Sequence, residues 1–197
     1  MKALSSDTFP FALTRYAFAT MIHCYPDKPT LRPMRPDDLT TVMEIQAACY
    51  GREMLEPVDI LHQRLRCSDD TCWVALHGNE VLAYLTAYRS RLGDVTPLHG
   101  QFNPASPADT LYLHDLAVHP CATGRKLGQT LVGNLLDMAQ HEKLHYSALV
   151  SVQDSYLFWS QQGYEDHPLS DEIQRGRLAS YGDSPRYMSR KLRSHAI

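Results

Sequence analysis

The chain has 197 residues, 44% of them hydrophobic, with a formal net charge of -3 and a pI of about 6.3. This length and composition suit one domain with a sizeable buried core, and the small net charge provides no overall attraction to nucleic acid or to anionic lipid. No run of about 18 apolar residues is present, so we expect no membrane span and no nucleic-acid partner.

The cysteines indicate the compartment. They are odd in number, spread out, and contain no C-x-x-C pair: Cys24, Cys49, Cys67, Cys72 and Cys121. This pattern argues against both a disulfide framework and a thiolate zinc site. We therefore expect a reducing, cytoplasmic location.

Residues 1–29 are expected to form an N-terminal extension to a domain over residues 30–195. Asp7, Pro10 and Arg15 interrupt any hydrophobic centre that a secretory signal needs. The domain itself begins with a short strand, TLRPM (30–34), and a helix that follows Pro36.

The next elements are a second helix, about 57–66, and two runs rich in β-forming residues, CWVAL and VLAYLTAY. The turn HGNE joins these runs, so they are expected to form a hairpin. Residues 91–109 then hold three prolines and two glycines, which predicts a long surface loop of the kind that borders functional sites.

The segment LYLHDLAV (111–118) is predicted to be a strand with an irregularity. Leu111 and Leu113 are odd-numbered, whereas Leu116 and Val118 are even-numbered. Because a regular strand alternates its faces with a period of two, the change of parity indicates a β-bulge around His114 and Asp115.

A long helix follows, with an apolar face made by Leu127, Leu131, Val132, Leu135, Met138 and Ala139. After it come a strand, HYSALVSV, a short helix at about 154–162 that stops at Gly163, and a late strand, RYMSRKL. Strands that interleave with helices indicate an α/β or α+β domain with a mixed sheet.

The segment between the bulged strand and the long helix has the character of an anion site. Gly124 and Gly128 permit close backbone approach, Arg125 and Lys126 add positive charge, and the unpaired amides of a helix start attract phosphate. Neither a Walker A motif nor a G-x-G-x-x-G fingerprint is present. The alternative is that the two glycines only make a turn and cap the helix.

Four segments together resemble the GNAT superfamily of acetyl-CoA-dependent N-acetyltransferases, and the likeness covers about residues 30–195. They are LRPMRPDDL, LAVHP with TGRKLG (123–128), SYLFWSQQGY (155–164) and RYMSRKL. Thr123 stands where the family usually has Gln or Arg, and Lys126 where it has the first glycine of its phosphate motif. Trp159 replaces the tyrosine that protonates the departing thiolate, and Val152 replaces a common asparagine.

The resemblance implies a mostly antiparallel mixed sheet of six or seven strands, with a bulged and splayed fourth strand and about four flanking helices. It also implies direct transfer of an acetyl group, in a ternary complex, from acetyl-CoA as cosubstrate to a primary amine. The acceptor would be a small molecule or a protein, with no metal, and the protein could form a homodimer.

The residues that the resemblance assigns to coenzyme binding are Leu116, Ala117, Val118, Thr123, Gly124, Arg125, Lys126, Leu127, Gly128, Gln129, Ser155, Phe158 and Trp159. Lys126 presents its amide to a phosphate if its φ is negative. Asp115 and His114 are the nearest candidates to take the amine proton, the alternative being a hydrogen-bonded pair that fixes the bulge. Tyr50, Glu53 and Glu56 are expected near the acceptor.

Two other classes stay open. One is an acyl-CoA-binding module with little or no turnover, in view of Trp159 and the altered phosphate loop. The other is a zinc metalloprotease, because HEKLH (141–145) matches H-E-x-x-H. Against it, His145 begins a β-rich run, Lys143 fills a middle position, and only Glu165 offers a distant third ligand. We expect a solvated helix end there, with no metal.

Overall fold

The computed structural model describes residues 28–153 and 155–193, so the predicted N-terminal extension lies almost wholly outside the described residues. The described strands are β1 (Thr30–Pro33), β2 (Trp73–His77), β3 (Glu80–Ser90), β4 (Thr110–Val118), β5 (Tyr146–Ser151), β6 (Glu165–Asp166) and β7 (Arg186–Lys191). The α-helices are α1 (Leu39–Cys49), α2 (Val58–Cys67), α3 (Leu127–His141), α4 (Tyr156–Gln161) and α5 (Glu172–Ala179). Short 3-10 turns cover Pro36–Asp38, Arg52–Met54 and Pro120–Ala122.

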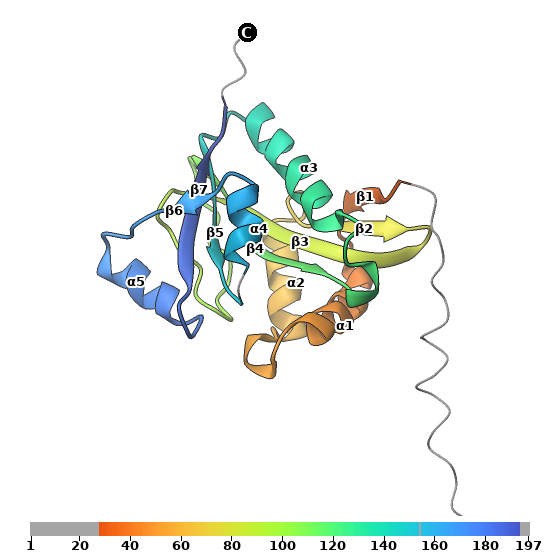
Figure 1. The fold of residues 1–197 in the computed structure, drawn as a ribbon. Helices are drawn as coiled ribbons and strands as arrows, with labels where there is room; N and C mark the ends of the chain where they lie inside the picture. Colours follow the sequence, from red (N-terminus) through yellow and green to blue (C-terminus); the bar gives the residue numbers. More distant parts are fainter. Residues whose placement is uncertain (1–27, 154, 194–197) are drawn as a thin grey trace, which may run out of the picture.

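The seven strands form one sheet in the order β1-β2-β3-β4-β5-β7-β6 (Figure 1). All neighbouring strands are antiparallel except β4 and β5, which run parallel. The mixed, mostly antiparallel sheet predicted from the sequence is therefore confirmed. The hairpin is also confirmed, since β2 pairs with β3 across a turn in which Gly78 has a φ of 58°.

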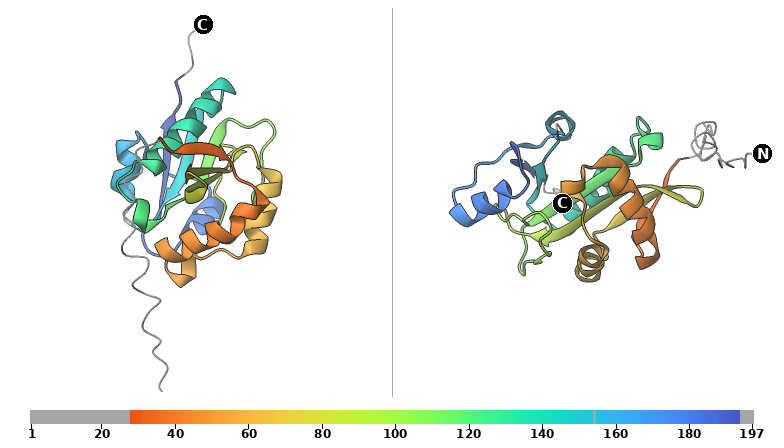
Figure 2. Two further views of the ribbon diagram at one scale, coloured as in Figure 1. Left: turned by 90° about the vertical axis from the view of Figure 1, so that its right-hand side faces the viewer. Right: turned by 90° about the horizontal axis from the view of Figure 1, so that it is seen from below.

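Helices cover both faces of the sheet (Figure 2). Three hydrophobic clusters result, two of them beneath these helices and a third around Tyr88, Phe102 and Tyr112. Apolar residues of α1 and α2, such as Ile45 and Leu65, pack on one face against β2 and β3. On the other face, α3 and Trp159 of α4 pack against β2 to β5. The predicted apolar stripe of α3 is buried, with Leu131 and Leu135 fully inaccessible.

The predicted β-bulge lies at His114. Asp115 pairs with Thr86, but Leu113 already pairs with Ala87, so His114 is the extra residue in β4. The pairing of β4 with β5 also ends at Leu113. Beyond this point β4 stays with β3 while β5 continues beside β7, and the two central strands part.

The loop over residues 91–109 contains no helix or strand, as expected, but its middle is not at the surface. Val95 and Phe102 are buried, and the Phe102 ring stacks on Tyr88 with 4.5 Å between centroids. The buried part of this loop also contacts α5, a helix that the sequence analysis did not predict. The Gln174 side chain on α5 accepts a hydrogen bond from the Val95 amide at 2.8 Å.

The HEKLH segment does not place its two histidines on one helix. Helix α3 ends at His141, Lys143 has a φ of 63°, and the His145 amide donates to Asp109 ahead of β5. Glu142 forms an ion pair with Arg89. Across the described ranges, no group of three or more His, Cys, Asp or Glu residues is placed to hold a metal ion. The helical geometry that the metalloprotease alternative needs is absent.

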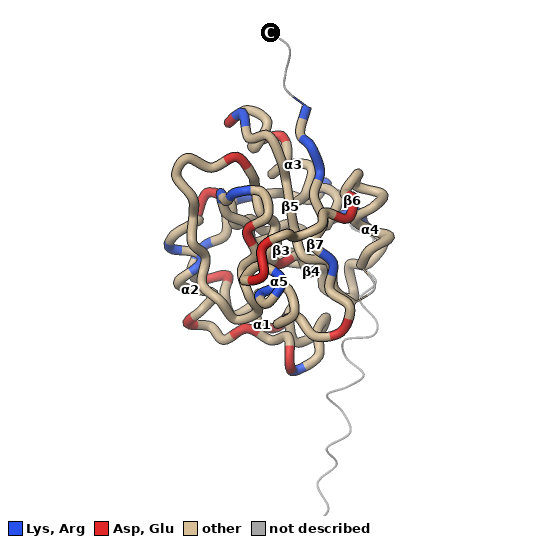
Figure 3. Tube along the Cα trace, turned by 90° about the vertical axis from the view of Figure 1, so that its left-hand side faces the viewer, with Lys and Arg blue, Asp and Glu red and all other residues tan. Residues whose placement is uncertain are grey.

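Acidic and basic residues alternate over the side of the molecule seen in Figure 3, while β7 carries a short basic run. The four cysteines within the described residues, Cys49, Cys67, Cys72 and Cys121, are free thiols. Within the same ranges, no helix combines the length and apolar character needed to cross a membrane.

One charged residue is buried in the centre of this architecture. Arg64 of α2 is only 1% exposed, and its guanidinium forms an ion pair with Glu56. The same group donates to the Gly100 carbonyl and lies 4.9 Å from the centroid of the Phe102 ring. Arg64 therefore connects the 91–109 loop to α2 close to the bulge at His114.

Arg64→Ala is expected to lower the free energy of unfolding by about 3–5 kcal/mol, because it leaves the Glu56 carboxylate buried and unpaired. Urea denaturation of the purified variants measures this difference. Asp166→Asn removes the partner of Arg186 in an exposed ion pair and should change stability by less than about 1 kcal/mol. Equal effects of the two substitutions would contradict the role given to Arg64.

Candidate active site

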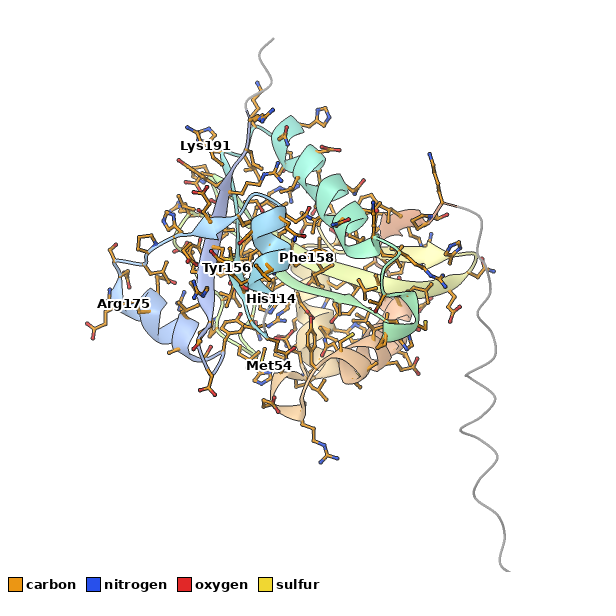
Figure 4. All side chains as sticks on the ribbon, viewed as in Figure 1. Met54, His114, Tyr156, Phe158, Arg175 and Lys191 are labelled. Atoms are coloured by element: carbon orange, nitrogen blue, oxygen red, sulfur yellow. The ribbon has the colours of Figure 1, made fainter. Side chains whose placement is uncertain are left out.

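A cavity of about 170 Å³ occupies the gap where β4 and β5 part. Two of its lining residues, His114 and Phe158, are labelled in Figure 4. Its walls come from the bulged part of β4, the end of β5, the start of α4, the segment after α1, and Tyr181 beyond α5. The lining residues used below are Tyr50, Glu56, Leu85, Leu113, His114, Asp115, Leu116, Leu149, Ser155, Phe158, Trp159 and Tyr181.

The two sides of this cavity differ in character. Leu85, Leu113 and Leu149 belong to the core shared with α3 and α4, so the side on that face is apolar. The side toward α1 and α2 presents the polar groups of Glu56 and Asp115. The cavity thus crosses the sheet and connects an apolar face with a polar one.

A second hollow, of about 380 Å³, lies beside the N-terminus of α3. Its lining consists of Leu116, Val118, Ala122, Thr123, Gly124, Lys126, Leu127, Gly128, Gln129 and Phe158. Leu116 and Phe158 line both hollows, so the two are adjacent. These two residues lie between the start of α3 and the gap where β4 and β5 part.

The loop before α3 contains two left-handed residues. Gly124 has a φ of 83°, and Lys126, the N-cap residue of α3, has a φ of 60°. The negative φ that we required of Lys126 is therefore wrong. A side chain in this conformation costs about 1–2 kcal/mol, which explains why the family usually has glycine at this position.

The residues at the start of α3 fit a phosphate-bearing ligand. The first amides of an α-helix have no acceptor within the helix and attract anions. A Cβ atom added to Gly128 would lie 3.5 Å from Leu116 and 3.7 Å from Phe158, the two residues that join the hollows. The glycine therefore keeps open the space through which a ligand reaches the helix amides.

The free edge of β4 supplies main-chain groups to the gap. The His119 amide donates to Leu82 of β3, and because alternate residues of an antiparallel ladder face the partner strand, Leu116 and Val118 face away from β3. Their carbonyl oxygens accept hydrogen bonds from Tyr50 at 2.9 Å and from Cys49 at 3.2 Å. Side chains at the end of α1 therefore bond to main-chain carbonyl groups of β4 that no longer face β5.

Two phenols surround the Asp115 carboxyl group. The Tyr50 hydroxyl lies 2.6 Å from Oδ1, and the Tyr84 hydroxyl lies 2.5 Å from Oδ2. Burial and the nearby Glu56 carboxylate raise the pKa of Asp115, against the opposing hydrogen bonds from Tyr50 and Tyr84. Burial and Asp115 in turn raise the pKa of Tyr50.

His114 lies in a different environment from its neighbour. Burial and the Arg64 guanidinium lower its pKa, with Glu56 opposing them. Burial alone would raise the pKa of Glu56, but His114 and then the Arg64 guanidinium hold it below its usual value. An ionised Glu56 can only accept, so Nε2 of His114, 3.4 Å away, carries the proton. Nδ1 of the neutral ring then holds a lone pair, and it has no hydrogen-bond partner among the described residues.

Most of the residues predicted for the site meet at these two hollows. Leu116, Val118, Thr123, Gly124, Lys126, Leu127, Gly128, Gln129, Ser155, Phe158, Trp159, Tyr50, Glu56, His114 and Asp115 all line one or both. Ala117, Arg125 and Glu53 do not line either hollow. Ala117 packs toward α1, and the Glu53 carboxylate lies over Gly51.

Sequence reasoning missed Arg64, Tyr84 and Tyr181. Arg64 had a recognisable signal, because it falls between Leu61 and Leu65 on the apolar stripe of α2, where a charge needs a buried partner. Tyr84 lies within a mostly buried strand and reaches Asp115 across 31 positions in the chain. No local pattern identifies such a contact.

A mixed sheet that splits beside an anion-binding helix start defines the class of fold. The chain belongs to the acetyltransferase (GNAT) family, whose sequence model matches residues 39–164. No curated protein sequence gave a significant match.

Solved structures show the same fold at low sequence identity. A GNAT-like decarboxylase, GphF, in complex with isobutyryl-CoA, aligns with a TM-score of 0.66 and 18% identity, over 83% of this chain and 100% of that chain. Arabidopsis thaliana Naa50, in complex with the bisubstrate analogue CoA-Ac-MVNAL, gives 0.62 and 14%, over 83% and 99%. The ribosomal-protein-S18-alanine N-acetyltransferase from Escherichia coli gives 0.59 and 12%, over 86% and 97%.

Lys126→Gly is expected to raise the free energy of unfolding by about 1 kcal/mol, because glycine adopts a positive φ without a steric cost. Lys126→Ala provides the matched control, since it removes the same ammonium group but keeps a side chain at the strained position. Chemical denaturation measures both variants. If alanine stabilises the protein as much as glycine, the backbone explanation is wrong.

Proposed function

We propose that the protein is an N-acetyltransferase that uses acetyl-CoA and acetylates a primary amine in a ternary complex. One observation carries this proposal: the hollow at the start of α3 adjoins, at Leu116 and Phe158, a cavity between the strands at the β4 bulge. A donor bound from the apolar side and an acceptor bound from the polar side would meet inside the split.

Acetyl-CoA, as cosubstrate, supplies an activated thioester to this reaction. The amides at the start of α3 and the Lys126 ammonium are suited to its diphosphate. The free edge of β4 at Leu116 and Val118 is suited to the amide groups of its pantetheine arm. Phe158 and Trp159 would flank the thiol end, because they line the cavity between the separated strands.

His114 is the group that we propose takes the amine proton. Its ring is neutral, its Nε2–H is held by Glu56, its buried Nδ1 has no hydrogen-bond partner among the described residues, and the residue lines the cavity. A base with these properties can accept a proton at neutral pH. Asp115 is less suited to this task, because each of its oxygens already forms a hydrogen bond with a phenol oxygen.

The acceptor is proposed to be a small-molecule or protein amine. Two structural neighbours have peptide or protein acceptors in their names. Naa50 is bound to the bisubstrate analogue CoA-Ac-MVNAL, and the Escherichia coli enzyme is a ribosomal-protein-S18-alanine N-acetyltransferase. GphF is described as a decarboxylase, so the shared fold does not determine the reaction. We favour amine transfer because a neutral histidine and two carboxyl groups face the acceptor side.

A second candidate is an acyl-CoA-binding module with little or no turnover. Trp159 favours it, because an indole N–H has no useful acidity at the position where the family usually has a tyrosine. Calorimetry with acetyl-CoA, followed by thiol release across an amine panel, separates the two functions. Acceptor-dependent release supports the transferase, and binding without release supports the module.

Gly128→Asp should weaken acetyl-CoA binding by on the order of 100-fold, because its carboxylate enters the hollow and repels the diphosphate. Gly133→Asp places the same charge on the same helix, where an added Cβ meets no atom within 4 Å, and should bind as wild type. Calorimetric titration of both variants gives the comparison. Equal affinities would remove the α3 start from the binding site.

The pH dependence of kcat/KM tests His114. Because the pKa of His114 is lowered, activity should fall on acidification only below the ordinary histidine value of about 6.5. Glu56→Gln removes the anion that raises the pKa of His114, so this acid limb should move to lower pH. His141→Gln, at the exposed end of α3, should leave the limb in place. A move to higher pH in Glu56→Gln would exclude His114 as the base.

A further inference from the structure

The hydrogen bonds around Asp115 depend on whether its carboxyl group carries a proton. The Tyr50 hydroxyl has one proton but lies within hydrogen-bonding distance of two oxygens, Oδ1 of Asp115 at 2.6 Å and the Leu116 carbonyl at 2.9 Å. A carbonyl oxygen accepts only, and so does an ionised carboxylate. If Asp115 were ionised, the single Tyr50 proton would have to serve both acceptors, and at least one of these short oxygen–oxygen contacts would be poorly bonded.

A protonated Asp115 removes this conflict. Tyr84 then donates to Oδ2, the proton on Oδ1 is donated to the Tyr50 oxygen, and Tyr50 donates to Leu116. Every contact in this chain contains one hydrogen. Because Tyr84 is fully buried and Tyr50 and Asp115 are only partly exposed, such satisfaction matters more than at the surface.

The charged and titratable groups around Asp115 agree with this arrangement. From the segment after α1, the Glu56 carboxylate raises the pKa of Asp115, and burial acts in the same direction. Tyr50, Tyr84 and His114 oppose the shift, and the net direction is upward.

We propose that Asp115 is a neutral carboxylic acid at physiological pH and that it supplies, through the Tyr50 hydroxyl, the proton taken up by the departing thiolate. This inference rests on the proposed transferase function and assigns its proton donor. Tyr50 is the catalytic residue, because it would touch the sulfur, and Asp115 acts through it.

Tyr50 is the suitable donor among the hydroxyls that line the cavity. The Tyr181 hydroxyl donates to the Thr96 carbonyl, and the Ser155 hydroxyl is bonded to Ser151. Trp159 packs edge-on against Phe158 and Tyr164 as part of the core. The Tyr50 hydroxyl also donates to a carbonyl, but that carbonyl belongs to Leu116, which lines both hollows, and the same hydroxyl contacts the Asp115 carboxyl group that can resupply its proton.

The proton balance of the step is closed. The carbon–nitrogen bond forms as His114 accepts a proton from the amine, and the carbon–sulfur bond breaks as the sulfur takes the Tyr50 proton. Tyr50 takes the Asp115 proton in the same step, so no free tyrosinate accumulates despite its raised pKa. After the products leave, His114 releases one proton to water and Asp115 regains one.

Infrared difference spectroscopy of the full-length protein tests the proton on Asp115 without any turnover. The wild-type minus Asp115→Asn spectrum at neutral pH should contain the carbonyl band of a protonated carboxylic acid. Asparagine keeps the hydrogen-bond pattern, because its amide donates to Tyr50 and its carbonyl accepts from Tyr84. A carboxylate band in place of the acid band would overturn the proposal.

Single-turnover kinetics test where that proton goes. With acetyl-CoA, Asp115→Asn and Tyr50→Phe should each slow acetyl transfer by on the order of 100-fold, the typical contribution of a general acid. With a para-nitrothiophenyl thioester, whose thiolate leaves without a proton, both variants should approach the wild-type rate. Equal losses of rate with both acyl donors would refute the proton relay. Asp115 would then act as a base or have only a structural role.

Tyr84→Phe serves as the matched control. This substitution removes the other phenol that contacts Asp115, but Tyr84 does not line the cavity. The infrared band of the protonated acid and the difference in rate between the two thioesters, measured in Asp115→Asn and Tyr50→Phe, should therefore both persist in the Tyr84→Phe background. Failure of the proposed function gives a different pattern, in which the wild type binds acetyl-CoA but acetylates no amine. The infrared band still decides the state of Asp115 in that case.

Discussion

The structure depends on a single extra residue in β4. With His114 inserted, β4 cannot continue beside β5, and the strands part after Leu113. The parting opens the cavity, turns Leu116 and Val118 toward the gap, and brings β4 to the start of α3. It also removes ladder hydrogen bonds, and the side chains of Cys49 and Tyr50 partly replace them.

Burying charge beside this gap needs compensation, which Arg64 provides. Its guanidinium is satisfied by Glu56, the Gly100 carbonyl and the Phe102 ring, so helix α2 and the 91–109 loop are held together under the bulge. A network of this kind contributes little net stability relative to an apolar core, but breaking it is costly. Its value lies in fixing Glu56, and hence the orientation of His114.

Features with local causes could be predicted from the sequence. The parity change in LYLHDLAV located the bulge, and the glycines of TGRKLG located the start of α3. Features that depend on distant contacts could not. The left-handed Lys126 contradicts ordinary side-chain preference, the burial of Phe102 needs Arg64 and Tyr88, and the setting of Asp115 depends on Tyr84 from another strand.

The bulge also explains how adjacent residues come to have opposite proton roles in our proposals. His114 packs near Phe102 and Glu56, whereas Asp115 faces Tyr50 and Tyr84 on the α1 side. Each environment favours the uncharged form, through a lowered pKa in the histidine and a raised pKa in the aspartic acid. One neutral group can therefore accept a proton while its neighbour releases one, and the site's total charge is preserved through the transfer.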